Sequence, residues 1–139
     1  ELDKMVLDEA ITTPDKEKID ISVLEKVLNT PIMQIARENP IKREQSFLLR
    51  TKCSDIKDTE CDDEVLLQGA IDLLILTKDG AIVVDYKYSG ASEEALIARY
   101  KKQLELYKLA LEKSLNMKVF KVYIYSVYLG KTLEMFDNN

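Results

Sequence analysis

Apolar residues recur along the chain with two different periods, and the period predicts where helices give way to strands. Over residues 1–40 they recur at helical spacing in short runs, and Thr30 followed by Pro31 is typical of a helix start. From about residue 42 to 51 a strand is predicted, with Phe47 and Leu49 on one face and Leu48 and Arg50 on the other. We therefore expect a helical lead-in segment over 1–40 and a single sheet domain over 41–139.

Two continuous apolar runs follow, at about 65–76 and 81–86, joined through Asp79-Gly80. Asp-Gly between apolar runs is a strong hairpin signal, because the turn needs a positive φ that glycine adopts freely. Both runs are apolar on both faces, so we expect central strands covered on each side. Counting back symmetrically from Asp79-Gly80 pairs Asp72 with about Lys87.

A long helix is predicted from about residue 93 to 115, with Ser92 as its N-cap and Asn116 at its end in a left-handed conformation. Its apolar residues, Tyr100 among them, lie three or four apart, as a buried helical face requires. Two further strands are predicted at about 120–127 and 132–136. The order indicates an α/β fold in which a helix crosses between strands of one mixed sheet.

Composition adds limits on size and location. The 139 residues are 46% apolar and 32% charged, which suits one folded domain rather than a disordered chain. No apolar run approaches the length of a membrane span, and no secretory leader is evident. The chain starts at Glu1 and not at Met, so we expect a fragment of a larger cytoplasmic protein without membrane contacts.

The charges are unevenly distributed. Net charge is −5, which argues weakly against a domain that captures DNA by itself. Residues 54–64 carry six acids and one base, and residues 99–121 carry seven bases and two acids. The acidic stretch is expected to be a solvated loop. Lys101 and Lys102 belong to a basic helix face that either lines the path of a DNA strand or is simply solvated.

Histidine is absent and cysteine occurs only at Cys53 and Cys61. Two thiols do not complete a zinc or iron–sulfur site, and catalysis by a Ser-His or Cys-His pair is excluded within this chain. Any chemistry must therefore use carboxylates, lysine, tyrosine and metals that prefer oxygen ligands.

Charged residues interrupt the two central strands. Asp72 lies within an otherwise apolar run, and Asp85 and Lys87 end the next one on a shared face. A carboxylate taken out of water is costly unless it is paired or bound to a metal. Two carboxylates and an ammonium within reach of one another suit Mg²⁺ or Mn²⁺ and phosphate chemistry. The alternative is a buried Asp–Lys salt bridge without function.

Two polar residues near this group add weaker signals. Gln103 lies at the edge of the apolar stripe of the long helix, where its amide either reaches the strand-end site or reaches solvent. Gln68 and Gly69 precede Asp72, and glycine within a strand often marks a close approach by another backbone or a ligand.

The segments Gln68-Gly-Ala-Ile-Asp72, Val83-Val-Asp85-Tyr-Lys87 and Gln103-Leu-Glu-Leu-Tyr107 resemble the three motifs of RecB-like nucleases of the PD-(D/E)XK superfamily. Lys42-Arg-Glu-Gln-Ser-Phe47 is similar to the Arg-Glu-x-x-Phe strand that precedes them in the nuclease domain of AddA-type helicase–nucleases. The resemblance covers about residues 41–129.

This resemblance implies a restriction-endonuclease-like core that hydrolyses DNA phosphodiester bonds with Mg²⁺ or Mn²⁺. Asp72, Asp85 and the backbone carbonyl of Tyr86 would hold the metal, and Lys87 would be the catalytic lysine. Gln68, Gln103, Tyr107, Lys101 and Lys102 would support the site or contact DNA. Glu44 would be a further ligand or an outer-sphere group, unless it is only an exposed strand residue beside Arg43.

The resemblance also implies a setting. The domain would cut single strands produced by helicase domains of the same chain, with an AddB-type second subunit, in double-strand break repair and recombination. The family commonly has a metal-binding histidine on an upstream helix, which this chain lacks, so the fragment is expected to bind metal weakly or to be inactive alone. The alternatives are a stand-alone or phage RecB-like exonuclease, and a catalytically silent module that docks DNA or another protein chain.

Overall fold

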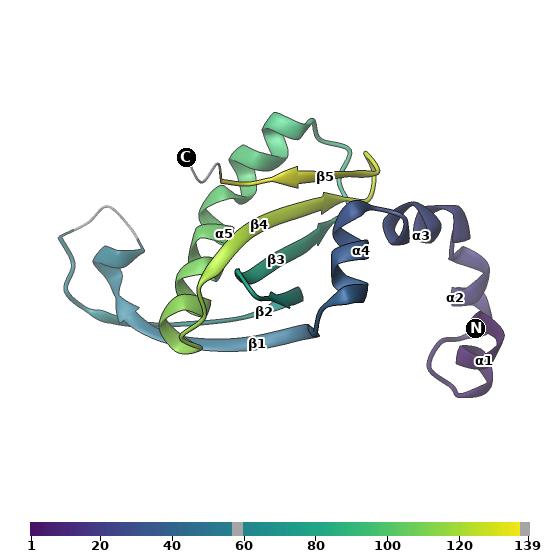
Figure 1. Ribbon diagram of the computed structural model, residues 1–139, viewed down its shortest axis with the longest axis horizontal. Helices are drawn as coiled ribbons and strands as arrows, with labels where there is room; N and C mark the ends of the chain where they lie inside the picture. The colour runs from purple at the N-terminus through teal and green to yellow at the C-terminus, as the bar shows by residue number, and fades with distance from the viewer. Residues whose placement is uncertain (57–59, 137–139) are drawn as a thin grey trace.

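A computed structural model describes residues 1–56 and 60–136 of the chain (Figure 1). The lead-in helices are α1 (Leu2–Leu7), α2 (Thr13–Lys18), α3 (Ile21–Leu28) and α4 (Pro31–Glu38). The remaining elements are β1 (Ile41–Lys52), the short helix η1 (Cys53–Asp55), β2 (Glu64–Thr77), β3 (Gly80–Lys87), α5 (Glu93–Ser114), β4 (Val119–Ser126) and β5 (Lys131–Glu134).

Within the described residues, the strands form a five-stranded mixed sheet in the order β1-β2-β3-β4-β5. All neighbours are antiparallel except β3 and β4, which run parallel because α5 connects them as a crossover. Buried residues of α5 pack on one face of the sheet and those of α4 on the other. We call these two sides the α5 face and the α4 face.

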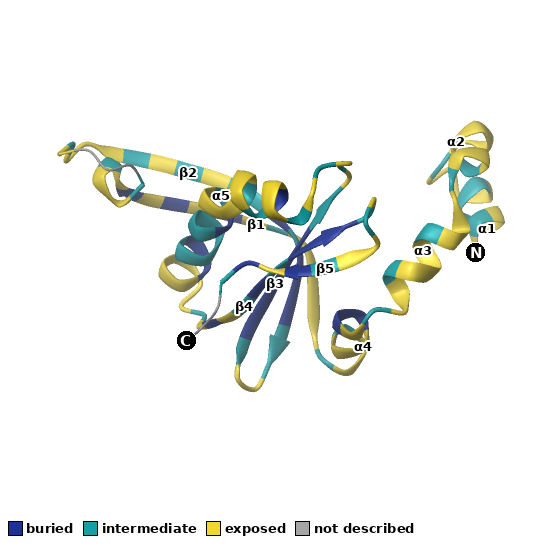
Figure 2. Cartoon of the chain, turned by 90° about the horizontal axis from the view of Figure 1, so that it is seen from above, coloured by how far each residue is buried: buried dark blue, intermediate teal, exposed yellow. Residues whose placement is uncertain are grey.

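Helices α1, α2 and α3 lead away from the sheet as an arm (Figures 1 and 2). Figure 2 shows that this arm is largely exposed, whereas the central strands are buried. No helix among the described residues combines the length and the apolar character that crossing a membrane requires.

The predicted elements are largely confirmed. Thr30 and Pro31 start α4, and the Ser92 side chain caps α5 by accepting a hydrogen bond from the Ala95 amide at 3.3 Å. Asn116 adopts the left-handed conformation expected of it, with φ of 48°. The acidic stretch 54–64 contains most of η1 and the first residue of β2, and its residues 57–59 lie outside the described part, as do residues 137–139.

The predicted register of the β2–β3 hairpin is wrong by two residues. Thr77 pairs with Gly80, so the turn consists of Lys78 and Asp79, and the ladder ends where Leu73 pairs with Val84. Gly80 has a φ of 138° and belongs to the strand rather than to the centre of the turn. The position opposite Asp72 is therefore Asp85 and not Lys87.

Beside this hairpin, β1 and β2 change the face to which their side chains point. Phe47 and Ile71 pack on the α5 face, whereas Leu73 packs on the α4 face, so strict alternation breaks between residues 71 and 73. In β1 the matching break falls at Glu44, whose φ of 49° is left-handed and which is skipped in the β1–β2 ladder. An irregularity of this kind redirects side chains locally. Asp72 consequently lies where the sheet changes faces.

Candidate active site

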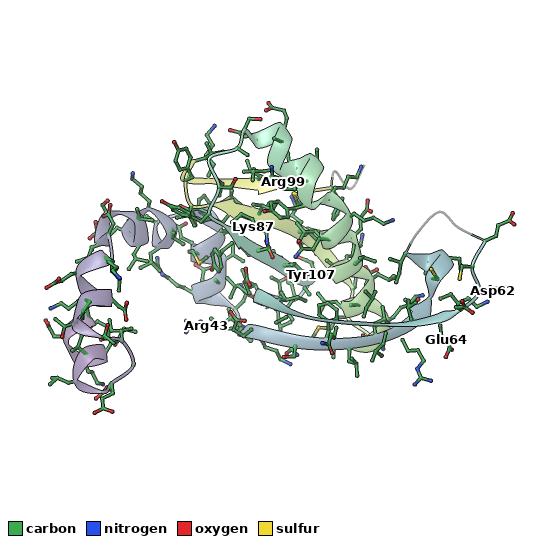
Figure 3. All side chains as sticks on the ribbon, turned by 180° about the vertical axis from the view of Figure 1, so that it is seen from behind. Arg43, Asp62, Glu64, Lys87, Arg99 and Tyr107 are labelled. Carbon is green, nitrogen blue, oxygen red and sulfur yellow. The ribbon has the colours of Figure 1, made fainter. Side chains whose placement is uncertain are left out.

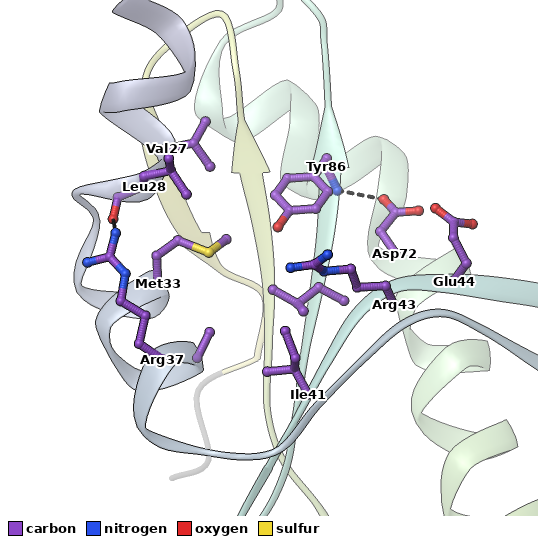
Figure 4. Close-up of a pocket in the computed structure, with 11 residues that line it drawn as sticks. Val27, Leu28, Met33, Arg37, Ile41, Arg43, Glu44, Asp72 and Tyr86 are labelled. Atoms are coloured by element: carbon purple, nitrogen blue, oxygen red, sulfur yellow. Dashed lines mark hydrogen bonds between the residues drawn. The ribbon is translucent and has the colours of Figure 1, made fainter. Parts of the chain in front are cut away.

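The candidate active site lies where β2 and β3 stop pairing. Beyond Val84 the backbone of β3 no longer bonds to β2, and the Tyr86 amide donates instead to Asp72 Oδ2 at 2.8 Å (Figure 4). Amide and carbonyl of one strand residue point to the same side of the strand. The backbone carbonyl of Tyr86 therefore points into the same gap as the Asp72 carboxylate.

Asp85 is buried, with 2% of its surface exposed, and its Oδ2 atom lies 2.6 Å from Lys87 Nζ. Among the described residues this oxygen has no hydrogen-bond partner of regular geometry. Burial raises the pKa of Asp85, the Lys87 ammonium works against that rise, and the negative charge of Asp72 adds to it. The carboxylate is therefore held out of water against a single cation.

Lys87 lies between Asp85 and α5, and Figure 3 shows it beneath that helix. Its Nζ atom is 4.6 Å from the centroid of the Tyr100 ring, which is a cation–π distance. Burial lowers the pKa of Lys87, but the neighbouring Asp85 more than offsets this, so the pKa stays above its ordinary value. The lysine therefore remains charged at neutral pH.

The two aspartates approach the gap from different sides. Asp72 lines a pocket on the α4 face, whereas Asp85 follows Val84 of the α4 face and so projects with Lys87 toward the α5 face. The charge of Asp72 nevertheless acts on the pKa values of both Asp85 and Lys87. This mutual influence places the two aspartates near each other at the end of the β2–β3 ladder, where Asp72 faces the pocket and Asp85 is buried.

Glu44 lies in β1 at the step of the ladder next to Asp72, and Figure 4 shows the two carboxylates side by side with Arg43 below them. Glu44 is exposed and lines the same pocket as Asp72. Its left-handed φ is uncommon for a residue with a side chain. Such strain is typical of positions where the surrounding structure directs a side chain to a functional site.

Gln103 and Tyr107 form a pair on α5. Gln103 Nε2 donates to the Tyr107 hydroxyl at 2.8 Å, and the Tyr107 ring packs edge-on against Phe47 with centroids 5.3 Å apart. Phe47 in turn covers Gly69, where a Cβ atom would lie 2.7 Å from the Phe47 ring. The close approach expected at Gly69 is therefore made by a side chain rather than by a backbone or a ligand.

Three of the residues expected to support the site are exposed on β2 and α5. Gln68 is exposed and pairs with Leu48 in the β1–β2 ladder. Lys101 and Lys102 are exposed on α5. No hydrogen bond or ion pair between described residues joins any of the three to Asp72 or Asp85, and their roles stay predictions.

The donors at the gap fit a magnesium-type ion. Mg²⁺ is usually held by one or two carboxylates and keeps several waters, and Asp72, Asp85 and the Tyr86 carbonyl match that set. Asp85 Oδ2 adds a buried oxygen that can accept a further partner. In the described residues no three acidic, cysteine or histidine side chains gather into a complete cage. The donors at the gap therefore fit a hydrated hard cation.

Sequence reasoning missed two features of this site. Periodicity assigns Tyr100 only to the apolar stripe of α5, although it contacts Lys87. Its position three residues before Gln103 was the available signal. The pocket on the α4 face, formed partly by α3 and α4, had no sequence signal because it depends on how those helices pack against the sheet.

The chain matches one family model and a set of similar proteins that are all named as nuclease subunits. The family model of the PD-(D/E)XK nuclease superfamily matches residues 1–134. The chain is 32% identical over 136 residues to an ATP-dependent helicase/nuclease subunit of Oceanobacillus iheyensis, covering 89% of this chain and 11% of that protein. The same-named protein of Clostridium acetobutylicum is 28% identical over 143 residues, covering 97% of this chain and 11% of that protein.

A third similar protein, the ATP-dependent helicase/nuclease subunit of Lachnoclostridium phytofermentans, is 41% identical over 86 residues, covering 60% of this chain and 6% of its own length. The chain thus spans about a tenth of the relatives that it matches over most of its length.

Proposed function

Because the chain belongs to the PD-(D/E)XK nuclease superfamily, we propose that it is a metal-dependent deoxyribonuclease whose centre is the gap between β2 and β3. The observation that carries this proposal is the buried Asp85–Lys87 pair beside Asp72. A buried ion pair contributes little to stability by itself. Its place at the end of the β2–β3 ladder, next to the pocket that Asp72 lines, favours a catalytic use.

Asp72, Asp85 and the Tyr86 carbonyl would hold Mg²⁺ or Mn²⁺ at this gap. When bound, such an ion supplies a Lewis acid that polarises a phosphodiester and makes water more acidic. Asp72 is oriented for this by the hydrogen bond from the Tyr86 amide. Asp85 is oriented by Lys87 and by the surrounding core.

Lys87 would act on the phosphate rather than on the metal. Its ammonium forms an ion pair with Asp85 and lies over the face of the Tyr100 ring, and these two contacts limit its movement. A positive charge fixed at this point offsets the negative charge that builds on the phosphate oxygens during cleavage. It can also orient the attacking water by hydrogen bonding.

The relatives named helicase/nuclease support a longer parent protein with helicase domains in the same chain. In that setting a motor delivers single strands to the nuclease, so a domain of net charge −5 need not capture DNA alone. A role in double-strand break repair and recombination, a cytoplasmic location and an AddB-type second subunit belong to the same proposal.

The second candidate is a silent module that keeps the fold to dock DNA or another protein chain. The Asp85–Lys87 ion pair is compatible with it, because such a pair can be purely structural. Asp72 is harder to explain in that case, since it lines an open pocket and reaches toward the same gap. The nuclease is therefore favoured.

Cleavage by the full-length protein tests the proposal. We expect cutting of single-stranded DNA with Mg²⁺ or Mn²⁺ and no cutting when both are chelated. Lys87→Met should abolish cutting, whereas Lys78→Met, in the exposed hairpin turn, should leave it unchanged. Equal activity in Lys87→Met and in the unsubstituted protein would place the cleavage outside this site and favour the silent module.

A further inference from the structure

A pocket of about 590 Å³ adjoins the gap on the α4 face (Figure 4). Asp72 and Tyr86 belong to its wall, so the pocket is continuous with the proposed catalytic centre. Most of its other wall is apolar and comes from α3, α4 and the start of β1: Val27, Leu28, Met33, Ala36 and Ile41. Its size lies within the range of pockets that bind small ligands.

Part of this apolar wall is left open to solvent. Leu28 is 51% exposed and Ile41 is 37% exposed. Leaving such side chains in water forgoes the stabilisation that burial would provide. An apolar surface kept open beside a reaction centre is a feature of ligand-binding pockets.

Three side chains at the pocket, Tyr86, Met33 and Arg43, suit a flat aromatic ring. The Tyr86 ring is held by an edge-on contact with Tyr125, with centroids 6.3 Å apart. Figure 4 shows Met33 and Tyr86 on opposite sides of the space and Arg43 reaching in from β1. Aromatic rings and guanidinium groups are the surfaces on which nucleobases stack in single-stranded DNA complexes.

We propose that this pocket binds an unpaired nucleobase of the strand being cut, next to the phosphate at Asp72. The inference rests on the proposed nuclease function and specifies its substrate. A nucleotide joins an anionic phosphate, which suits a metal at Asp72, to a flat ring, which suits the adjacent pocket. A base inside a duplex is stacked and paired and would first have to leave the helix. The pocket therefore selects single strands.

Photocrosslinking tests this placement without requiring cleavage. A single-stranded oligonucleotide carrying 5-iodouracil is irradiated with the full-length protein in the absence of divalent metal, and the crosslinked peptides are mapped. We expect crosslinks to Met33 or Tyr86. Ala36→Phe, which fills the pocket from α4, should remove them, and Ile35→Phe, on the neighbouring exposed position, should retain them.

Cleavage of a modified strand gives a second measurement. A strand with one abasic residue beside the cut site should be cut roughly tenfold more slowly there than the normal strand, the effect of losing about one stacked base. Ala36→Phe should cut both strands at the same rate.

These results separate the pocket from the nuclease itself. The absence of crosslinks at both Met33 and Tyr86, or their persistence in Ala36→Phe, would overturn the nucleobase pocket, and so would equal cutting of normal and abasic strands by the unsubstituted protein. Absence of all cutting would instead overturn the proposed function, while the crosslinks would still report whether a base enters the pocket.

Discussion

Asp72 accepts a hydrogen bond from the Tyr86 backbone amide at 2.8 Å, and this contact bridges the two strands just where their ladder ends. Asp72→Asn keeps an oxygen acceptor for that amide but removes the charge. We expect cleavage by this variant to fall on the order of 100-fold or more, since a metal contributes several kcal/mol to the transition state.

Asp72→Ala provides the comparison, because it removes the acceptor as well as the charge. Its free energy of unfolding should fall by about 1 kcal/mol, whereas that of Asp72→Asn should change less. Denaturant titration and a cleavage assay on both variants check this. Normal cleavage by Asp72→Asn would show that Asp72 only closes the sheet.

Glu44 combines backbone strain with a carboxylate beside the site, and two variants separate these properties. Glu44→Gly removes both the side chain and the cost of a left-handed φ of 49°, so the free energy of unfolding should rise by about 1 kcal/mol. Glu44→Gln retains the strain and loses only the charge. Glu44 is exposed and Mg²⁺ usually takes only one or two carboxylates, so we expect Glu44→Gln to lower cleavage by roughly tenfold, the low end of the range for an outer-sphere group. A loss as large as that of Asp72→Asn would make Glu44 a metal ligand.

Tyr100 is expected to position Lys87 through its ring face. Tyr100→Phe keeps the ring and should cleave at a rate within about twofold of the parent, whereas Tyr100→Leu should lose roughly 2- to 30-fold in kcat, the range of a partly buried cation–π contact. KM should be unchanged in both. Tyr128→Leu, at a position 63% exposed, is the control. Equal losses in the Phe and Leu variants would assign the role to the hydroxyl.

Asp55, which lies outside the site, makes the stability of the fold depend on pH. The Thr51 hydroxyl and the Lys113 ammonium, at 2.6 and 3.0 Å, hold the pKa of Asp55 below its ordinary value. The ionised form therefore stabilises the fold above the unfolded-state pKa, and this stabilisation is lost as the pH falls through the folded-state pKa. Asp55→Asn should lower the denaturation midpoint at neutral pH and not in strong acid.

Asp62→Asn is the matched control for Asp55, because Asp62 forms an ion pair with Lys52 but its side chain is 87% exposed. The denaturation midpoint of Asp62→Asn should hardly differ from that of the unsubstituted protein, at neutral pH or in strong acid. A difference between Asp55→Asn and the parent that persists unchanged into strong acid would mean that the Asp55 charge is not responsible.

The order of elements was predictable because local signals agreed with one another. Thr30-Pro31 and Ser92 start helices where they should, and the apolar stripe of α5 faces the sheet. The crossover between β3 and β4 followed from the long helix between two apolar strands. These features depend on residues close in sequence, where periodicity and capping carry the information.

The details of the site were less predictable because they depend on the relation between strands. A turn at Asp79-Gly80 would place Lys87 opposite Asp72, whereas the observed turn at Lys78-Asp79 places Asp85 there. The change of face at Glu44 had no signal, because a left-handed φ is expected of glycine rather than of glutamate. The contact of Tyr100 with Lys87 was hidden because an aromatic residue in an apolar stripe is usually only a core residue.

Asp72 and Asp85 reach the gap from different faces, and the proposed function requires that they hold one divalent ion between them. Titration of the full-length protein with Mn²⁺ by calorimetry, in the absence of ATP, tests this most directly. We predict a binding heat that is lost in both Asp72→Asn and Asp85→Asn and kept in Asp79→Asn, an exposed residue of the hairpin turn. An undiminished heat in either of the first two variants would contradict the shared site.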